Sequence, residues 1–341
     1  MSGTTGGTRL TEVPVREAVG LRLAHDLTQI IPGQFKGRLF TKGHLITEED
    51  IPRLLDIGKE HIYILELGST ELHEDEAAQR LAAGLCADTD FSATEPHEGK
   101  VTIKAERRGL LEIDGELVHA INRLGEIALA TVAHCTVVEP GQRVAATRVI
   151  PLVVDKDKVE QAERLLSDYR SEQGIPPLRI RPFRAMRIGL LTTGGEVFSG
   201  RIQDKFGPAV RDKVAAYGSE VIEQRFAPDD RHTIVKEIHY LLDAEYDMIL
   251  VTGGMSVDPD DRTPAAIREA GAEIVSYGTP MLPGSMLLMG YLHGVPILGL
   301  PGCVMHDPYT SFDVLLPRIL AGDTITREDI VTMGFGGMLG C

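Results

Sequence analysis

Long apolar runs are what this sequence lacks first. No stretch of its 341 residues is apolar over the roughly 18 positions that a membrane-spanning helix needs. The first ten residues, MSGTTGGTRL, are polar and rich in glycine and threonine, without the apolar segment of a signal peptide. We therefore expect a frayed tail at residues 1–10, no membrane span and a cytoplasmic protein.

Positive charge is also scarce. Lys and Arg total 35 against 50 Asp and Glu, which gives a net charge of −15. This balance disfavours generic binding to nucleic acid or to an anionic membrane. An anionic ligand would need local help from backbone N–H groups, from a few Arg or Lys side chains, or from a divalent cation.

Cysteine is rare and scattered. The four residues, Cys86, Cys135, Cys303 and Cys341, show no C-x-x-C spacing, so we expect a reduced cytosolic protein without a zinc site. Cys303 shares a loop with His306, which invites a nucleophile and base interpretation. No third partner is identifiable, so we read Cys303 as a small apolar filler.

The apolar fraction of 43% and the length are those of a soluble protein with two or three domains. After the tail at 1–10 we expect an N-terminal α/β segment at 11–97. A β-rich segment should follow at 98–180, with a hairpin turn at Asp114-Gly115, a helix over 157–174 and a Pro-rich connection. An α/β domain at 181–322 and a C-terminal tail at 323–341 complete the division.

From residue 186 onward, strand-like and helical patterns alternate. RIGLLTT, EVIEQRF and DMILVT read as strands, and DKFGPAVRDKVAAYG and DDRHTIVKEIHYLLDAEY as the helices between them. This alternation predicts a doubly wound, mostly parallel α/β sheet with helices on both faces. Ligands of such sheets bind at the carboxyl ends of the strands, around a switch in strand order.

Three glycine-containing loops should meet at that edge. TTGGEVFSGRIQDK and TGGMSVDPDDRTP share Thr-Gly-Gly at the same place in the unit, and LPGCVMHDP follows a third strand. Glycine permits positive φ and removes the Cβ that would hold backbone N–H groups away from a phosphate. The alternative for each loop is a tight turn that needs glycine only for its shape.

Acidic residues crowd the second loop. Asp258, Asp260 and Asp261 would repel one another if close, and Mg²⁺ is a natural counter-charge that leaves positions for phosphate oxygens. The alternative is that Asp258-Pro259 opens a turn and that Asp260 and Asp261 are solvated acids near the start of a helix, where Thr263 is the N-cap and Pro264 the first residue. Spacing alone does not decide between the two.

Charged residues also flank the first loop. Glu196 and Asp204 would face the same ligand or else lie as surface acids on an acidic protein. Lys205, Arg201 and Arg262 are the local cations available to a phosphate, and each taken alone reads as a solvated charge.

Four stretches together resemble a known family. LLTTGGEVFSGRIQD, VTGGMSVDPDDRTPAAI, TPMLPGSMLLMG and VPILGLPGCVM are similar, in order and spacing, to the molybdopterin-binding domain of molybdenum cofactor biosynthesis proteins. That family has a Thr/Ser-Gly-Gly loop with an Asp-x-Thr-Pro or Asp-Tyr-Thr element, then Pro-Gly-Lys-type and Leu-Pro-Gly-Asn-type loops. The resemblance covers residues 186–322 and implies a pterin ligand.

Carried over residue by residue, the resemblance implies Asp261 as the catalytic acid that supports Mg²⁺-dependent chemistry on the ligand's phosphates. Asp204 and Asp258 would be further metal ligands. The positions implied to contact phosphate or pterin are Thr193, Gly194, Gly195, Glu196, Gly253, Gly254, Ser256, Pro283, Gly284, Pro301 and Gly302.

Two branches of the family are represented. GGMSV is similar to the Gly-Gly-Val-Ser-Val of the molybdenumtransferases. The segment that precedes the pterin domain in those enzymes is also similar to FKGRLFTKGHLITEEDIPRLLDIGKEHIYIL of this chain. DDRTPAAI looks more like the adenylyltransferase element. The closer branch implies an enzyme that binds adenylylated molybdopterin, releases AMP with Mg²⁺ and inserts molybdate. It also implies a homo-oligomer with cofactor-assembly or molybdenum-enzyme partners.

The sequence departs from this pattern at three motif positions. Asp258 stands where the family has glycine, Ser285 where it has lysine and Cys303 where it has asparagine. The basic, Gly-rich insertion loop of the transferases is not evident, and only a short tail follows Gly322 where they have a β domain. These departures keep two alternatives open, a non-catalytic pterin carrier or sensor and a molybdopterin adenylyltransferase.

Overall fold

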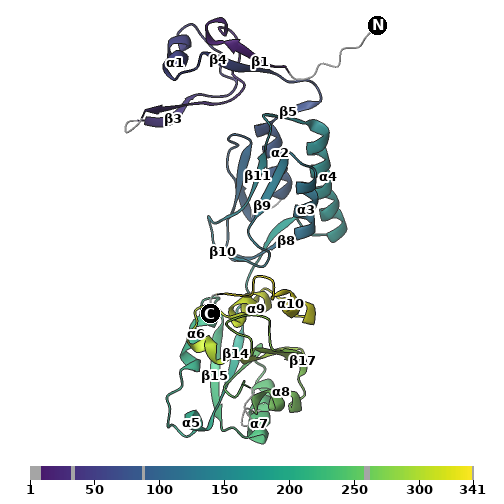
Figure 1. The fold of residues 1–341 in the computed structure, drawn as a ribbon. Helices are drawn as coiled ribbons and strands as arrows, with labels where there is room; N and C mark the ends of the chain where they lie inside the picture. Colours follow the sequence, from purple (N-terminus) through teal and green to yellow (C-terminus); the bar gives the residue numbers. More distant parts are fainter. Residues whose placement is uncertain (1–8, 32–34, 87–88, 257–261, 340–341) are drawn as a thin grey trace. The chain divides into compact units, whose positions relative to one another are not determined.

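The computed structural model describes residues 9–31, 35–86, 89–256 and 262–339 (Figure 1). The chain divides into two units, Met1–Ile180 and Arg181–Cys341. Each unit has hydrophobic cores built from its own residues. Among the described residues, no helix is both long and apolar enough to cross a membrane.

The first unit contains two separate cores. The elements around the first are β1 (Arg9–Pro14), η1 (Val15–Glu17), β2 (Leu27–Ile31), β3 (Phe35–Phe40), α1 (Asp50–Asp56) and β4 (His61–Glu66). Those of the second are β5 (Glu71–His73), α2 (Glu74–Leu85), β6 (Phe91–Ala93), β7 (Lys100–Ala105), β8 (Gly109–Ile113), α3 (Gly115–Arg123), β9 (Ile127–Thr131), β10 (Val137–Val138), β11 (Arg143–Val149), β12 (Val153–Asp155), α4 (Lys156–Gln173) and β13 (Leu178–Arg181).

The second core is an antiparallel sheet with helices packed on it. Strands run in the order β6-β7-β11-β9, and Val101 and Ile103 of β7 are buried in the same cluster as Leu81 of α2 and Leu166 of α4. The core therefore begins near Leu72, and α2 packs with the β-rich segment rather than with the rest of residues 11–97.

The prediction of a hairpin turn at Asp114-Gly115 is wrong. Asp114 is the N-cap of α3, and its Oδ1 accepts hydrogen bonds from the backbone N–H groups of Glu116 (2.7 Å) and Leu117 (3.2 Å). An aspartate before glycine suits both a turn and a helix start, and the helical spacing of Leu117 and Ile121, both buried, selects the helix.

The second unit is built on one six-stranded sheet. Its strands are β14 (Arg187–Thr193), β15 (Glu220–Ala227), β16 (Met248–Thr252), β17 (Glu273–Tyr277), β18 (Leu288–Leu292) and β19 (Val295–Leu300), in the order β15-β14-β16-β19-β18-β17. Its helices are α5 (Gly195–Phe198), α6 (Phe206–Ala215), α7 (Arg231–Asp243), α8 (Thr263–Glu269), η2 (Gly302–Met305), α9 (Ser311–Leu320) and α10 (Arg327–Thr332). Strand β14 pairs in parallel with β15 and β16, β16 with β19, and only β18 runs antiparallel to its neighbours.

Alternation along these strands places helices on both faces. Leu190 and Leu250 pack in one cluster with α6 and α9, whereas Leu191 and Val251 pack in another with α7 and α8. A strand with both faces buried is continuously apolar, as β16 is. The expected doubly wound, mostly parallel α/β fold is confirmed. The chain leaves β14 for β15 on one side and returns to β16 on the other, so the switch in strand order lies between β14 and β16.

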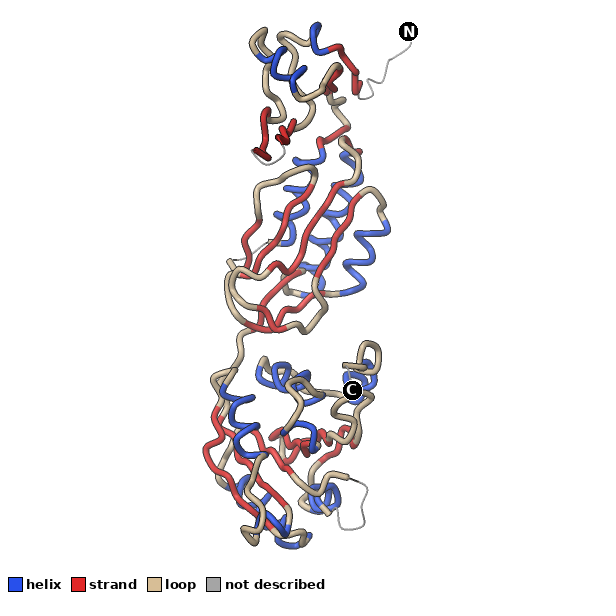
Figure 2. Tube along the Cα trace, turned by 60° about the vertical axis from the view of Figure 1, so that its left-hand side comes forward, coloured by secondary structure: helices blue, strands red, loops and turns tan. Residues whose placement is uncertain are grey.

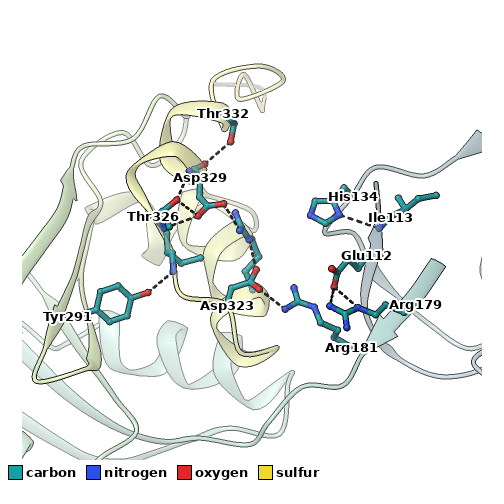
Figure 3. Close-up of polar contacts among 12 residues, drawn as sticks. Glu112, Ile113, His134, Arg179, Arg181, Tyr291, Asp323, Thr326, Asp329 and Thr332 are labelled. Atoms are coloured by element: carbon teal, nitrogen blue, oxygen red, sulfur yellow. Dashed lines mark hydrogen bonds and ion pairs between the residues drawn. The ribbon is translucent and has the colours of Figure 1, made fainter. Parts of the chain in front are cut away.

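The segment 323–341, expected as a tail, carries α10 and buries Ile325 and Ile330. Asp323 accepts a hydrogen bond from Arg181 Nη1 (2.5 Å), as Figure 3 shows, and a second one from Arg318 Nε (2.9 Å). Burial alone would raise the pKa of Asp323, but these two guanidinium groups hold that pKa below its usual range. The C-terminal segment is therefore tied to the second unit by buried apolar residues and by ion pairs.

Candidate functional site

A cavity of about 630 Å³ opens where the loops after β16 and β19 meet. We call it the sheet-end cavity. Four parts of the second unit line it: residues 253–256 after β16, residues 282–286 before β18, the loop that begins at Leu300, and Phe206 of α6. The full lining is Phe206, Gly253, Gly254, Met255, Ser256, Leu282, Pro283, Gly284, Ser285, Met286, Leu300, Pro301, Gly302, Cys303, Met305 and Asp307.

The two Thr-Gly-Gly loops touch each other at the floor of the site. A Cβ on Gly253 would lie 2.1 Å from the carbonyl oxygen of Thr193, and the φ of Gly253 is +87°. The buried hydroxyls of Thr193 and Thr263 lie 3.0 Å apart, and a Cβ on Gly254 would lie 2.8 Å from the Thr263 oxygen. The close approach of the two backbones therefore explains, independently of any ligand, why position 253 is a glycine.

Gly253 and Gly254 also line the cavity, whereas Gly194, Gly195 and Glu196 do not. The backbone N–H of Gly195 donates to Asp229 Oδ2 at 2.7 Å, so a carboxylate of the chain itself caps the short helix α5. Glu196 is exposed. The structure thus brings the two loops together but places only the second one at the cavity wall.

Asp204 has a clear positioning role. Its two carboxylate oxygens accept from the backbone N–H groups of Phe206 (2.9 Å) and Gly207 (3.0 Å) at the start of α6. Gln224 Nε2 donates to Asp204 Oδ2 (2.6 Å) and to Thr192 Oγ1 (2.9 Å). These bonds fix Phe206, which forms part of the cavity wall, and they occupy both oxygens of the carboxylate that the sequence assigned to a metal.

The segment 282–286 is held by α9. A Cβ on Gly284 would lie 2.2 Å from Ser311 Oγ, and the Gly284 carbonyl accepts hydrogen bonds from Ser311 Oγ (2.7 Å) and Thr279 Oγ1 (3.0 Å). The peptide bond between Leu282 and Pro283 is cis. The sequence placed Pro283 and Gly284 at the site, and both line the sheet-end cavity.

The third loop is anchored by a lysine that lies outside it. Lys213 Nζ of α6 donates to both carboxylate oxygens of Asp313 (2.7 and 2.8 Å) and to the carbonyl oxygens of Asp307 (3.3 Å) and Pro308 (2.9 Å). This one cation ties the end of the loop to α6 and to the first turn of α9. The positions predicted from the sequence in this loop, Pro301 and Gly302, both line the cavity.

The loop after β16 is held by Tyr277, whose hydroxyl lies 3.0 Å from the Met255 carbonyl oxygen and 3.3 Å from that of Ser256. Ser256, which the resemblance assigned to contact with phosphate or pterin, lines the cavity. Asp258 and Asp261, the two acids that the sequence assigned to a metal in this loop, lie outside the described residues. Within the ranges that are described, no group of three or more His, Cys, Asp or Glu side chains is arranged to hold a metal ion.

The cavity wall is mostly apolar. Asp307 is the one charged residue among those that line it in the described part of the chain, and three of the others are methionines. Methionine and leucine side chains suit a flat heterocycle, while the carboxylate and the exposed backbone can orient its polar edge. The cations Lys205, Arg201 and Arg262, considered as phosphate partners, are not among the lining residues.

Sequence reasoning missed much of the apolar wall. Phe206, Met255, Leu282, Met286, Leu300 and Met305 line the cavity without having been predicted. An apolar residue beside a glycine loop looks the same in sequence whether it faces a core or a ligand. The available signal was that a methionine follows each of the three glycine motifs that line the cavity: Met255 after Gly-Gly, Met286 after Pro-Gly-Ser, and Met305 after Pro-Gly-Cys-Val.

Two family models match parts of this chain. Residues 189–321 match a family model described as a probable molybdopterin binding domain. Residues 12–66 match a second one, described as a domain of unknown function. The first match supports the molybdopterin-binding family for the α/β domain, and it does not separate the molybdenumtransferase branch from the others.

Curated relatives cover a smaller region. A CinA-like protein of Mycobacterium avium is 34% identical over 90 residues, which are 26% of this chain and 21% of that protein. A CinA-like protein of Mycobacterium tuberculosis is 31% identical over the same length. The chain thus spans about a fifth (21%) of the length of the curated relatives it matches.

Two solved structures illustrate the similarity. The molybdopterin biosynthesis enzyme MoaB of Thermus thermophilus is 28% identical, over 40% of this chain and 98% of that one, with a TM-score of 0.34. The molybdopterin biosynthesis MoeA protein of Pyrococcus horikoshii is 16% identical, over 92% of this chain and 75% of its own, with a TM-score of 0.32.

Proposed function

We propose that the sheet-end cavity binds molybdopterin or its adenylylated form, and that the chain acts in molybdenum cofactor biosynthesis. The observation that carries the proposal is the cavity itself, formed at the carboxyl ends of β16 and β19 within the region that matches the molybdopterin-binding family. Its volume of about 630 Å³ suits a ligand of pterin size. The apolar wall would cover the ring system, and Asp307 would accept hydrogen bonds from its N–H edge.

A catalytic step is a finer proposal. Hydrolysis of the phosphoanhydride with release of AMP and insertion of molybdate would depend on Mg²⁺, which neutralises charge on the phosphates. Among the described residues Asp204 is committed to α6, so the metal would rely on Asp261 and Asp258. An assay with adenylylated molybdopterin, Mg²⁺ and molybdate would show AMP release that falls sharply in Asp261→Asn. If no AMP is released, or the variant releases it as fast, the catalytic step is abandoned.

A non-catalytic carrier or sensor is the second candidate, favoured by one observation. The described cavity wall has no Lys or Arg, and Ser285 and Cys303 occupy positions where the resembling enzymes have lysine and asparagine. Saturable binding of molybdopterin without AMP release from the adenylylated form would support this candidate.

Blocking the cavity tests the binding proposal directly. Gly302 lines the cavity, and it has no described neighbour within 4 Å of an added Cβ and no positive φ, so Gly302→Leu adds a side chain at the cavity wall without strain. We expect the variant to melt within about 2 °C of the wild type, since an unstrained surface substitution costs little. Its affinity for molybdopterin in calorimetry should fall by about tenfold or more, a loss of about 1.4 kcal/mol.

Gly115→Leu is the matched control, because Gly115 is equally open and lies in α3, outside the cavity. This control should bind like the wild type. If Gly302→Leu also binds like the wild type, the ligand sits elsewhere and the proposed site is wrong.

A further inference from the structure

A second hollow lies in the first unit, on the β6-β7-β11-β9 sheet. We call it the basic hollow. Because Val101, Ile103 and Ala105 of β7 are buried against the helices, the alternating Lys100, Thr102 and Lys104 point to the opposite face. Figure 2 shows the strands of this sheet in front of its helices. The lining residues are Thr94, Glu95, His97, Lys100, Thr102, Lys104 and Arg143.

Three cations of this hollow have no ion-pair partner within the described part of the chain. Arg143 of β11 lies directly opposite Lys104 of β7 in the antiparallel register, and Lys100 lies on the same strand. Among the residues that the structure describes, no carboxylate oxygen lies within 4.0 Å of the charged nitrogens of Lys100, Lys104 or Arg143. Like charges directly across a sheet destabilise it unless a counter-ion lies between them.

One polar group beside these cations, the Thr94 hydroxyl, is a donor that an anion can use. Thr94 Oγ1 accepts the backbone N–H of Thr102 (3.0 Å), which leaves its hydroxyl hydrogen free to donate into the hollow. Glu95 is the one carboxylate among the described lining residues. Because three cations line the same hollow, its net charge is +2. That local excess occurs in a chain whose net charge is −15.

The size of the hollow limits its ligand. A volume of about 220 Å³ lies below the roughly 300 Å³ at which pockets for drug-sized ligands begin. The lining contains no Phe, Tyr or Trp on which an unpaired base could stack, so it does not suit single-stranded nucleic acid. A compact polyanion with many acceptor oxygens fits both the positive charge and the volume of the hollow.

We propose that the basic hollow binds a diphosphate group, free or carried by a small metabolite, through Lys100, Lys104 and Arg143. Arg143 and Lys104 hold the group from facing strands, and Thr94 donates to an oxygen between them. The site is distinct from the sheet-end cavity, which draws its lining from the second unit alone. The proposal therefore does not depend on the pterin ligand.

Calorimetry of the full chain with inorganic diphosphate at low salt tests it. We expect one saturable site per chain, and Lys104→Gln/Arg143→Gln should weaken binding about tenfold or more, since charge-assisted hydrogen bonds are lost. The control Arg164→Gln/Lys236→Gln removes one Arg and one Lys charge from exposed positions that form no ion pair with any described residue, and it should bind within about twofold of wild type. Without ligand, the first double variant should melt no lower than wild type, because a like-charge pair is gone.

Further arms locate the site and identify the source of the diphosphate. Gly302→Leu should leave diphosphate binding intact. If this variant no longer binds diphosphate, the binding belongs to the sheet-end cavity. ADP binding as tightly as free diphosphate would show that a carried group is accepted, whereas binding of diphosphate alone would restrict the site to the free anion. No saturable binding, equal weakening in the control double variant, or tighter binding of a short single-stranded oligonucleotide would overturn the proposal.

Discussion

At the scale of single residues, glycine has two different roles in the loops of this site. Gly302 faces open space, while Gly253 is pressed against the backbone of Thr193 at a distance that no Cβ tolerates. Both stand in glycine motifs that look equivalent in sequence. Distinguishing ligand approach from backbone packing needed the partner segment, which comes from a strand 60 residues away in the chain.

Gly253→Ala should therefore destabilise the protein in the absence of any ligand. The added Cβ meets the Thr193 carbonyl oxygen at 2.1 Å, and the φ of +87° is itself strained for alanine. Both effects act on the folded state, and we expect a loss of about 2 kcal/mol or more in the free energy of unfolding. Urea unfolding measures this loss, with Gly302→Ala as the unstrained control. An unchanged free energy in Gly253→Ala would mean that the two loops are not packed as described.

Glu74 should give the first unit a pH dependence. Burial, reinforced by the charge of Asp75, raises the pKa of Glu74 from 4.5 to about 7. Between these two values the unfolded chain has lost a proton that the folded chain retains, so the free energy of unfolding falls as pH rises from about 4.5 to 7. Glu74→Gln cannot ionise and should be more stable relative to wild type at pH 8 than at pH 4.5.

Urea unfolding at the two pH values measures this difference, and Glu172→Gln, at an exposed position of α4, is the control. If the stability gap between Glu74→Gln and wild type does not change with pH, the pKa of Glu74 is the same in the folded and the unfolded chain, and the raised pKa is refuted.

At the scale of elements, the helices and strands that local sequence patterns specify were the most predictable. The helix expected over 157–174 is α4, Lys156–Gln173, ended by Gly174 in the left-handed conformation, because its apolar spacing and its glycine stop are both local signals. The alternation of strands and helices likewise gave the fold of the second unit. The turn predicted at Asp114-Gly115 was wrong because this dipeptide suits both a hairpin turn and a helix start. The buried residues further along the chain select the helix.

The site was less predictable because its walls are assembled between elements. Asp204 reads as a ligand acid in sequence, yet its oxygens cap α6 and bind Gln224 of β15. Lys213 had no motif around it, and its importance appears only when α6 lies beside the loop after β19. Contacts across 100 positions of sequence, as between Lys213 and Asp313, leave no periodic trace in either segment.

Lys213→Met tests how strongly α6 holds that loop. The lysine and Asp313 are 14% and 13% exposed, so the pair is well shielded. Asp313 keeps its bonds from Thr310, and we therefore expect a loss of about 1–3 kcal/mol in the free energy of unfolding, less than for an isolated buried charge. Ligand affinity should fall as well, because Asp307 and Pro308 lose their anchor.

Urea unfolding and calorimetry with molybdopterin measure these two effects, and Lys236→Met, at an exposed lysine of α7, is the control. Stability and affinity both equal to those of Lys236→Met would show that the loop keeps its place without Lys213.

At the scale of the whole molecule, all the described residues that line the sheet-end cavity belong to the second unit. Its lining runs from Phe206 to Asp307, and the residues that position the lining, among them Gln224, Tyr277 and Ser311, belong to the same unit. Among the described residues, the cores on the two faces of its sheet draw only on positions from Phe183 onward. A domain with its own core and its own site is expected to fold and bind alone.

Residues 181–341 produced alone should therefore unfold cooperatively and bind molybdopterin within about threefold of the full chain, a difference of about 0.6 kcal/mol. Arg181 belongs in this fragment, since it pairs with Asp323 and ties the C-terminal segment down. A fragment that starts at residue 182 is the comparison, and it should be less stable because Asp323 keeps only Arg318. A folded fragment 181–341 with tenfold weaker binding would mean that the first unit contributes to the site. An unfolded one would mean that the two units depend on each other for stability.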